Sequence, residues 1–407
     1  MDGARTRGHP TALAAVGAMI RAGAPGAVLL VGPSGIGKTT LAIDLAAGLL
    51  CTATDPATRP CGACRACRLA IGGNHPDVHR FGPEGPGRQV VIGGPGKARG
   101  IRDLIGELAL LPIEGGARVA IIEAAHRMNE DAQAALLKTL EEPPAATTIV
   151  LCADTEESLL PTIRSRCARI RLGPVGVRDI EAILAEQDAA EPAVAARAAR
   201  IAGGRPGLAL AWVRTPDALR DRDAIGRSLL DLADARPGER LATVRALVAQ
   251  AVGIATVTGL AVAGSATASP GDATAGAADA PKPSRGVRRR TPEPAPDPTD
   301  GGEDALDAIG PARTPAAERR RAAEALIGLW TDVARDLAFV QQGLDRSVRD
   351  VAALDDTRAL AARLQPGDLG GFLDRLGNAA VLVAGNVSPE LVLDDLALAW
   401  PRPRRAA

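Results

Sequence analysis

The stretch AVLLVGPSGIGKT, residues 27–39, constrains the fold of this chain more than any other feature. An apolar run leads into GPSGIGKT (32–39), which matches the phosphate-binding loop pattern in a strand–loop–helix context. In such a loop the backbone N–H groups and the helix N-terminus converge on phosphate oxygens. Lys38 would reach the β and γ phosphates, and the Thr39 hydroxyl would bind Mg²⁺. The residues predicted to form this site are Gly32, Pro33, Ser34, Gly35, Ile36, Gly37, Lys38, Thr39 and Thr40. The pattern predicts nucleotide-binding capacity, not hydrolysis.

Short apolar runs alternate with helical patterns up to about residue 172, which predicts an α/β sheet with crossover helices. The runs are rich in β-branched residues and bounded by Gly, Pro or charge, as buried parallel strands are. We expect strands at 27–32, 118–123, 147–153 and 169–172. We expect helices at 38–50, 99–111, 129–142 and 157–165.

After Gly173-Pro174 the strand pattern ends and helical patterns follow. Short helices are expected over 176–213, and two more over 217–262 with a break near Arg236-Pro237. The segment 264–315 is rich in Gly, Ala, Pro, Ser and Asp, so it is predicted to be a disordered insertion. Its basic stretch RGVRRR (285–290) is interpreted as a solvated linker rather than a nucleic-acid contact. Helices return from Ala316, and the last one is predicted to begin at Ser388-Pro389.

The bulk composition excludes several classes of protein. Lys and Arg together number 48, as do Asp and Glu, so the charge balance does not indicate a strongly basic nucleic-acid-binding protein. No apolar run was found to approach the ~20 residues that a membrane-spanning helix needs. The N-terminus MDGARTRGHP lacks the apolar stretch of a secretory signal. Six cysteines in 407 residues do not form a disulfide framework, so a reducing, cytoplasmic location is expected.

Four of the cysteines form a candidate metal site. Cys51, Cys61, Cys64 and Cys67 are spaced C-x9-C-x2-C-x2-C in a hydrophilic loop. Thiolates at such spacing are typical of tetrahedral Zn²⁺, and four sulfur ligands make the site structural. An iron–sulfur cluster is the alternative, and His75 or His79 could replace a cysteine ligand. Cys152 and Cys167 are expected to be buried small hydrophobic residues.

The strand 118–122 leads to Glu123, where a nucleotide-hydrolysing enzyme carries its acids. Glu123 could reach Mg²⁺ directly or through water, but the next residue is Ala124, which has no side-chain oxygen to orient a water molecule. His126 is expected to be exposed after the strand. The pattern indicates a complete phosphate loop joined to half of a hydrolytic site.

Five motifs in order carry a resemblance to a known family. They are GPSGIGKT (32–39), CGACRAC (61–67), NHPDV (74–78), RVAIIEAAHRMNEDAQAALLKTLEEPP (118–144) and LLPTIRSRC (159–167). Together they resemble the clamp loader subunits of bacterial DNA polymerase III, which are AAA+ proteins. The resemblance is strong over residues 5–215 and weak in the helical C-terminus. It implies an AAA+ P-loop α/β domain, a helical lid domain and a helical collar domain. The implied bounds are 1–173 for the AAA+ domain with its zinc loop 51–67, 174–214 for the lid, and 215–263 with 316–407 for the collar interrupted by 264–315.

The family has a hydrolysing motor branch, gamma/tau, and a stator branch, delta prime. The pair Glu123-Ala124 departs from the motor's acidic pair. In GGRPGLAL (203–210), Pro206 falls where the motor has a phosphate-sensing Arg, with Arg205 beside it. The chain also ends soon after one helical domain, although a short gamma-like product would share that property. These departures favour the delta prime branch with weak or absent ATPase activity of its own, and ATP with Mg²⁺ is left open. The alternatives are an active gamma/tau-like motor or an unrelated P-loop NTPase with a zinc loop.

The resemblance also implies a role for Arg166 and a set of partners. In IRSRC (163–167), Arg166 would be an arginine finger that points into the ATP site of a neighbouring subunit. A guanidinium suits this role because its planar fork holds phosphate oxygens and stays charged. The implied partners are the delta and gamma/tau subunits, and through the assembled complex the sliding clamp and primed DNA. No membrane partner is implied.

Overall fold

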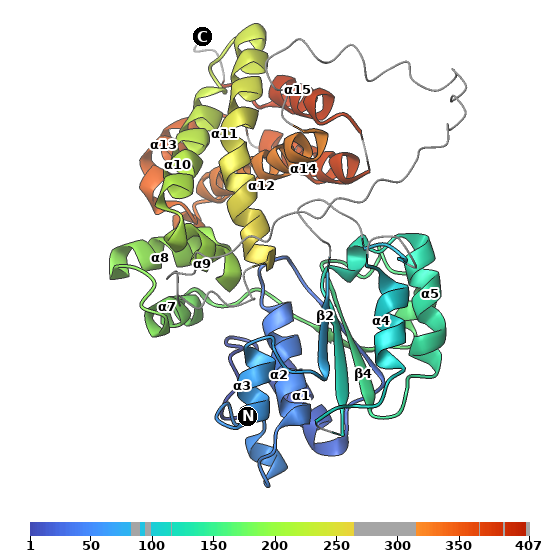
Figure 1. Cartoon of the computed structure of the whole chain (residues 1–407). Helices are drawn as coiled ribbons and strands as arrows, with labels where there is room; N and C mark the ends of the chain where they lie inside the picture. The colour runs from blue at the N-terminus through green and yellow to red at the C-terminus, as the bar shows by residue number, and fades with distance from the viewer. Residues whose placement is uncertain are drawn as a thin grey trace, which may run out of the picture. The chain divides into compact units, whose positions relative to one another are not determined.

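The computed structural model describes residues 1–82, 90–93, 99–114, 116–263, 315–365, 367–385 and 387–403 (Figure 1). The predicted insertion 264–315, with its basic stretch 285–290, lies outside the described residues except for Pro315. The expectation of disorder there stays a prediction.

The N-terminal part is built on a parallel sheet of five strands in the order β2-β3-β4-β1-β5. The strands are β1 (Ala27–Val31), β2 (Val78–Phe81), β3 (Arg118–Ile122), β4 (Thr147–Ala153) and β5 (Ala168–Arg171). Every residue of β1, β3 and β4 is buried, as expected for apolar runs covered on both faces. The α/β prediction is confirmed, and the carboxyl ends of the strands meet at one edge.

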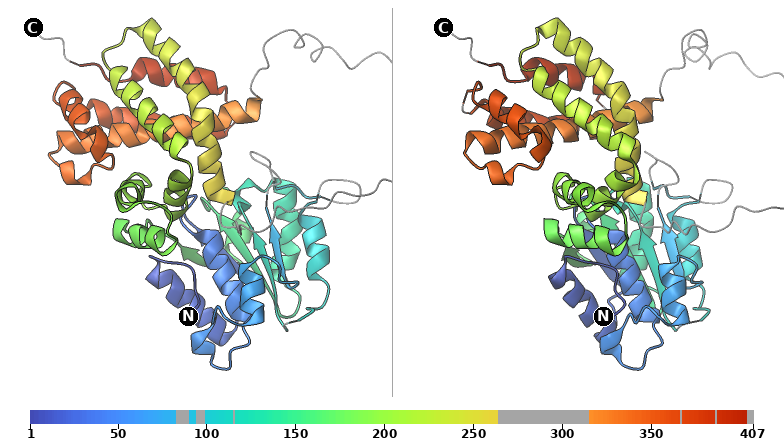
Figure 2. Two further views of the ribbon diagram at one scale, coloured as in Figure 1. Left: turned by 60° about the vertical axis from the view of Figure 1, so that its left-hand side comes forward. Right: turned by 90° about the vertical axis from the view of Figure 1, so that its left-hand side faces the viewer.

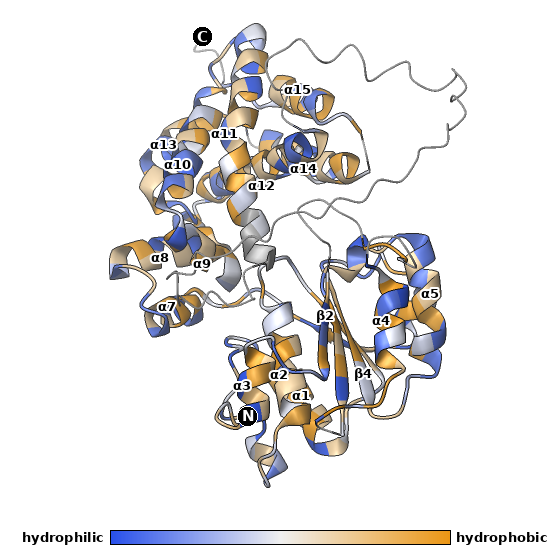
Figure 3. Cartoon of the chain, viewed as in Figure 1, coloured by the Kyte–Doolittle hydropathy of each residue, from blue (hydrophilic) through white to orange (hydrophobic). Residues whose placement is uncertain are grey.

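Helices cover both faces of this sheet (Figures 1 and 2). Alternate residues of β1 point to opposite sides, since Val28 and Leu30 belong to one apolar core and Leu29 and Val31 to the other. The first core includes residues of α1 (Pro10–Ala22), α2 (Lys38–Leu50) and α3 (Arg65–Ile71), and both α1 and α2 are mostly apolar in Figure 3. The second includes residues of α4 (Ile101–Leu108), α5 (Glu130–Glu141) and the short α6 (Pro161–Arg164).

Several elements of this part were missed by the pattern reading, among them α3, which lies partly in the predicted cysteine loop. The edge strand β2 has the sequence VHRF, and only its two ends are buried, so a search for continuous apolar runs overlooks it. The helix α1 precedes the first predicted strand and was not assigned. The predicted helix 157–165 is also shorter in the structure, because only Pro161–Arg164 is helical.

The rest of the described chain is helical. Its helices are α7 (Val177–Glu186), α8 (Pro192–Ile201), α9 (Pro206–Arg214), α10 (Pro216–Asp231), α11 (Pro237–Ala263), α12 (Ala316–Gln341), α13 (Leu354–Ala361), α14 (Asp368–Ala384) and α15 (Pro389–Ala399). They share one apolar core that contains the aromatic residues Trp330, Phe372 and Trp400 in mutual contact. The predicted break before Pro237 and the start of the last helix at Pro389 are confirmed.

One result differs from the membrane expectation. By length and composition alone, the segment Pro237–Val257 of α11 is apolar enough to cross a membrane. In the structure, however, Val244, Leu247 and Ile254 of this helix are buried in the shared helical core. The helix is therefore accounted for as a core helix, whose apolar character serves packing against neighbouring helices.

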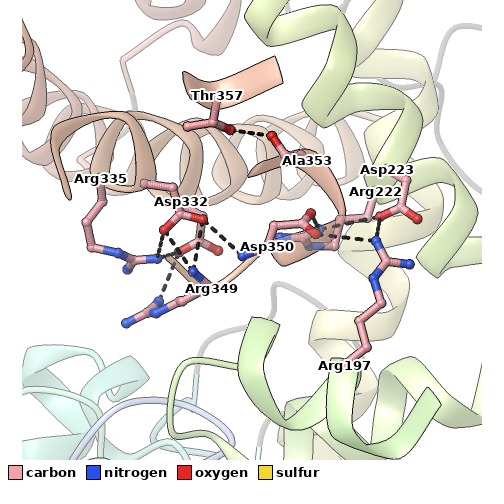
Figure 4. Close-up of polar contacts among 10 residues, drawn as sticks. Arg197, Arg222, Asp223, Asp332, Arg335, Arg349, Asp350, Ala353 and Thr357 are labelled. Atoms are coloured by element: carbon pink, nitrogen blue, oxygen red, sulfur yellow. Dashed lines mark hydrogen bonds and ion pairs between the residues drawn. The ribbon is translucent and has the colours of Figure 1, made fainter. Parts of the chain in front are cut away.

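Ion pairs join α8 to the longer helices (Figure 4). Arg197 of α8 pairs with Asp223 of α10 at 2.6 Å. Arg222, which is 6% exposed, donates to Asp350 at 2.6 Å. Asp350 also lies 3.5 Å from Arg197, so the carboxylate bridges two guanidinium groups from different helices. This network connects the short helices α7–α9 to the bundle that follows them.

Candidate nucleotide site and cysteine cluster

The phosphate loop follows β1 and ends where α2 begins at Lys38. Gly35 and Gly37 have φ values of 77° and 110°, in the left-handed region where glycine is the favoured residue. The loop therefore turns sharply enough to aim the first N–H groups of α2, which have no partner within the helix, toward a common point. This backbone turn is the one expected of a phosphate loop, and nucleotide binding itself stays a prediction.

The side chain of Lys38 is folded onto its own loop. It is 8% exposed, and its Nζ donates to the carbonyls of Gly32 at 2.6 Å and Pro33 at 3.0 Å. Its third contact is with Asp154 Oδ1 at 2.7 Å. An ammonium group has three donors, so all of them are engaged here. Asp154 directly follows β4, and the sequence reading did not identify it.

Glu123 is also engaged. Its Oε1 accepts from Arg80 Nε at 2.9 Å and from Arg80 Nη2 at 2.5 Å. Both side chains are 20% exposed, and Arg80 belongs to the missed strand β2. Ala124 follows at φ 51°, an uncommon backbone conformation for a residue with a side chain. The structure thus gives Glu123 a protein partner, while Ala124 offers no side-chain oxygen beside it.

The expectation that His126 is exposed was wrong. The Asp154 backbone N–H donates to His126 Nδ1 at 3.2 Å, and His126 Nε2 lies 3.7 Å from Asp154 Oδ2. The imidazole is 19% exposed, and burial lowers the pKa of His126 below its ordinary value. His126 therefore belongs to the same polar group as Asp154 and Lys38, which no local sequence signal indicated.

The start of α9 contacts the phosphate loop through the backbone. The Gly207 N–H donates to the Gly35 carbonyl at 2.9 Å. Pro206, the residue expected at the motor's arginine position, is the first residue of α9 and is buried. The Arg205 side chain donates to the Ala202 carbonyl at 3.1 Å, and burial lowers the pKa of this guanidinium. This segment thus offers the loop a peptide group rather than a guanidinium.

Arg166 lies beyond α6 and just before β5. Its Nη2 is 2.5 Å from Glu141 Oε1, and its Nη1 donates to the Thr162 carbonyl at 3.0 Å. The side chain is 35% exposed, so part of the guanidinium faces solvent. Its described partners belong to α5 and the α6 turn rather than to the phosphate loop of the same chain. Glu141 is exposed at the end of α5, and its carboxylate pairs with Arg166 there.

The four clustered cysteines come together as the spacing predicted. Cys51 follows α2, and Cys64 caps the start of α3, which contains Cys67. The four Sγ atoms, including that of Cys61, lie within 4.8 Å of one another. Tetrahedral coordination at Zn–S distances of ~2.3 Å requires sulfur separations of about 3.8 Å, so a small contraction suffices.

Backbone N–H groups support thiolates in this cluster. The Cys64 N–H donates to Cys61 Sγ at 3.3 Å, and the Cys67 N–H donates to Cys64 Sγ at 3.4 Å. Although burial opposes ionisation, the N–H groups of Cys67 and Thr52 lower the pKa of Cys64 to about 6, whereas burial raises the pKa of Cys67 in the absence of a metal ion. The donor set therefore fits a thiophilic metal ion.

The remaining candidate ligands lie apart from this cluster. His75 Nδ1 accepts from the Asp77 N–H at 3.1 Å, and His79 Nδ1 lies 2.9 Å from Glu107 Oε2. Cys152 and Cys167 are buried, as expected, and burial raises the pKa of these thiols to about 12 and about 11. None of these four residues is placed to act as a ligand or a reactive nucleophile.

Comparisons with known proteins agree with the predicted resemblance. Residues 10–176 match the family described as DNA polymerase III, delta subunit. The DNA polymerase III subunit delta prime of Pseudomonas aeruginosa is 41% identical over 143 residues, which are 35% of this chain and 42% of that protein. The subunit delta prime of Escherichia coli is 35% identical over 185 residues, or 46% of this chain and 53% of that protein. The subunit tau of Salmonella typhimurium is 34% identical over 183 residues, or 44% of this chain and 27% of that protein. The chain thus spans about half of the length of the delta prime relatives that it matches.

Proposed function

We propose that this chain, which is similar to delta prime subunits of DNA polymerase III, works as a stator subunit of the bacterial replicative clamp loader. It would assemble in the cytoplasm with delta and gamma/tau subunits into a complex that places the sliding clamp on primed DNA. The observation that carries this proposal is the 35–41% identity to delta prime relatives over 143–185 residues. The site supports it, because the complete phosphate loop lies beside the pair Glu123-Ala124, in which only Glu123 is acidic.

The chain's own residues are poorly arranged for hydrolysis. Residues 35–39 would hold the phosphates of ATP, and the Thr39 hydroxyl would bind Mg²⁺. Bound Mg²⁺–ATP would supply the phosphoanhydride bond. Glu123 is held by Arg80, and Ala124 has no side-chain oxygen to orient an attacking water. We therefore expect nucleotide binding with weak or absent turnover.

Arg166 would act on a neighbouring subunit rather than on this one. Its guanidinium is partly exposed at the edge of the α/β domain and is oriented by the Thr162 carbonyl and Glu141. Engagement with the γ-phosphate of a neighbour would replace the Glu141 carboxylate by phosphate oxygens of the same charge sign. In other phosphoryl-transfer systems such a residue contributes ~10³–10⁵ in rate.

The cysteine cluster would hold one structural Zn²⁺. Four thiolates leave no open coordination position, so the ion would fasten the loop 51–67 between α2 and α3 rather than take part in chemistry. An iron–sulfur cluster is the alternative occupant of the same donor set.

Two experiments test the proposal. With this chain as bait in extract of its source bacterium, delta and gamma/tau should be recovered, and their absence would refute assembly into a loader. In a reconstituted loader, Arg166→Ala should lower ATPase activity, while nucleotide binding by this chain stays unchanged. Arg164→Ala, two residues away, is the matched control. Equal effects of both variants would show that Arg166 is not the finger.

A gamma/tau-like motor is the second candidate function. The observations in its favour are the intact phosphate loop and the 34% identity to a tau subunit. ATP hydrolysis by the purified chain that disappears in Lys38→Ala would establish it and overturn the stator proposal.

A further inference from the structure

We infer that, without nucleotide, the Asp154 carboxylate pairs with Lys38 in the place that a phosphate would take. When nucleotide binds, the released carboxylate would face a divalent cation. Nucleotide binding by this chain would then depend on the cation. The inference rests on the nucleotide-binding part of the proposed function, and it reassigns the metal-facing acid from Glu123 to Asp154.

The sheet topology brings Asp154 to the phosphate loop. Strands β4 and β1 are neighbours in parallel register, with Ala153 opposite Val31. The residue after each strand therefore lies at the same edge, where ligands bind in parallel α/β sheets. Asp154 follows β4 and the loop follows β1. Lys38 Nζ donates to Asp154 Oδ1 at 2.7 Å, although the two residues are 116 positions apart in the chain.

A bound phosphate and the Asp154 carboxylate would compete for the Lys38 ammonium group. When Lys38 turns to a phosphate, the Asp154 carboxylate loses its 2.7 Å partner and stays beside the incoming negative charge. Its other described polar side-chain contact is with His126 at 3.7 Å, and burial lowers the pKa of that imidazole, which favours its neutral form. Two adjacent anions in a partly buried site repel each other. A divalent cation with oxygen ligands removes that repulsion.

Glu123 is the less suitable acid for this role. Arg80 donates two N–H groups to Glu123 Oε1, and both side chains are mostly shielded from solvent. The Glu123 charge is therefore compensated whether or not nucleotide is present. Asp154 is 35% exposed on its side chain and gives up its cation to the ligand. Removing the Asp154 carboxylate should therefore weaken the dependence of nucleotide affinity on the divalent cation, whereas removing that of Glu123 should not.

The experiment measures the Kd of a fluorescent ADP analogue in Mg²⁺ and in EDTA for the wild-type chain, Asp154→Asn, Asp154→Ala and Glu123→Gln. Glu157→Gln, an exposed carboxylate three residues along, is the control. Thermal unfolding confirms that each variant is folded. The two Asp154 variants should bind the metal-free analogue at least about tenfold more tightly than wild type, equivalent to ~1.4 kcal/mol. Their gain in affinity from Mg²⁺ should shrink correspondingly.

The outcomes separate the possibilities. Glu123→Gln and Glu157→Gln should keep the wild-type ratio of affinities in Mg²⁺ and EDTA. An unchanged ratio in both Asp154 variants, or a ratio lost in Glu123→Gln alone, overturns the inference. If the wild type and every variant fail to bind under either condition, the phosphate loop is not a nucleotide site and the inference is wrong, while assembly into a loader is still decided by the bait experiment.

Discussion

Arg240 provides the sharpest test of how the helical part is held together. This side chain is fully buried, and it reaches from the start of α11 to the ends of two other helices. It donates to Ala233 at 2.9 Å, to Ala235 at 3.1 Å and to Trp400 at 2.7 Å, in each case to the backbone carbonyl. A weaker contact of 3.3 Å reaches the carbonyl of Ala397. A cation at helix C-termini is stabilising, and the Arg240 guanidinium also binds the Trp400 carbonyl, 160 residues away in the chain.

The substitution Arg240→Met keeps the apolar stem and removes the donors. Three good hydrogen bonds from a charged donor are together worth roughly 4–9 kcal/mol, at ~1.5–3 kcal/mol each. The cost of burying the guanidinium offsets several kcal/mol of this, and burial lowers the pKa of Arg240 for the same reason. We expect a net loss of roughly 3 kcal/mol in the free energy of unfolding of the helical core. The corresponding decrease in Tm is roughly 6–12 °C, at ~2–4 °C per kcal/mol.

Intrinsic Trp fluorescence measures the predicted loss in stability of the helical core separately from the α/β domain. The chain has three Trp residues and no Tyr, and Trp212, Trp330 and Trp400 all belong to the helical core. Unfolding followed by Trp emission therefore reports on the helical core rather than on the α/β domain. Arg236→Met, an exposed arginine four residues earlier, is the control and should change the free energy of unfolding by less than ~0.5 kcal/mol. Equal stabilities of Arg240→Met and Arg236→Met would refute the reasoning.

Two further predictions concern the metal site and the ion-pair network. Metal analysis of freshly purified, reduced protein should find one zinc per chain, and iron in place of zinc would contradict the assignment. A strong chelator should lower the thermal stability of the α/β domain in the wild type and in the control Cys152→Ser. The chelator should have no such effect in Cys64→Ser. Burial would raise the pKa of Asp350, but Arg222 and Arg197 lower it below its ordinary value, so this carboxylate stabilises the fold above pH ~4 and the stabilisation is lost as pH falls through the folded pKa. Asp350→Asn should therefore reduce Trp-detected stability at pH 7, with a gap to wild type that closes in acid; a gap independent of pH would exclude the ion pairs as its cause.

The parts that sequence reasoning predicted are those with a local cause. The strands β1, β3 and β4 are continuous apolar runs, and the phosphate loop has its glycines where the backbone needs left-handed φ values. The cysteine cluster is also local, because it is confined to the segment 51–67. In each case the residues that determine the structure are neighbours in the chain.

The residues that were missed are determined by the sheet order. Arg80 meets Glu123 because β2 lies beside β3, and these residues are 43 positions apart. Asp154 meets Lys38 because β4 lies beside β1. A single sequence does not specify which strands become neighbours, so a polar residue after a strand looks like an ordinary loop residue until the order is known. The prediction that Glu123 faces Mg²⁺ was made without its pairing with Arg80 for the same reason.

The contacts of Lys38 give the phosphate loop a structural role beside the proposed nucleotide binding. Lys38 ties the carbonyls of Gly32 and Pro33 to the end of β4 through Asp154, and the same loop receives the Gly207 N–H from α9 through the Gly35 carbonyl. A chain that never hydrolysed ATP would still need Lys38 to hold this loop in shape. Retention of the complete motif is therefore not by itself a sign of turnover. The variant that distinguishes the two roles changes Asp154 rather than Lys38, because it releases the lysine while leaving the phosphate donors in place.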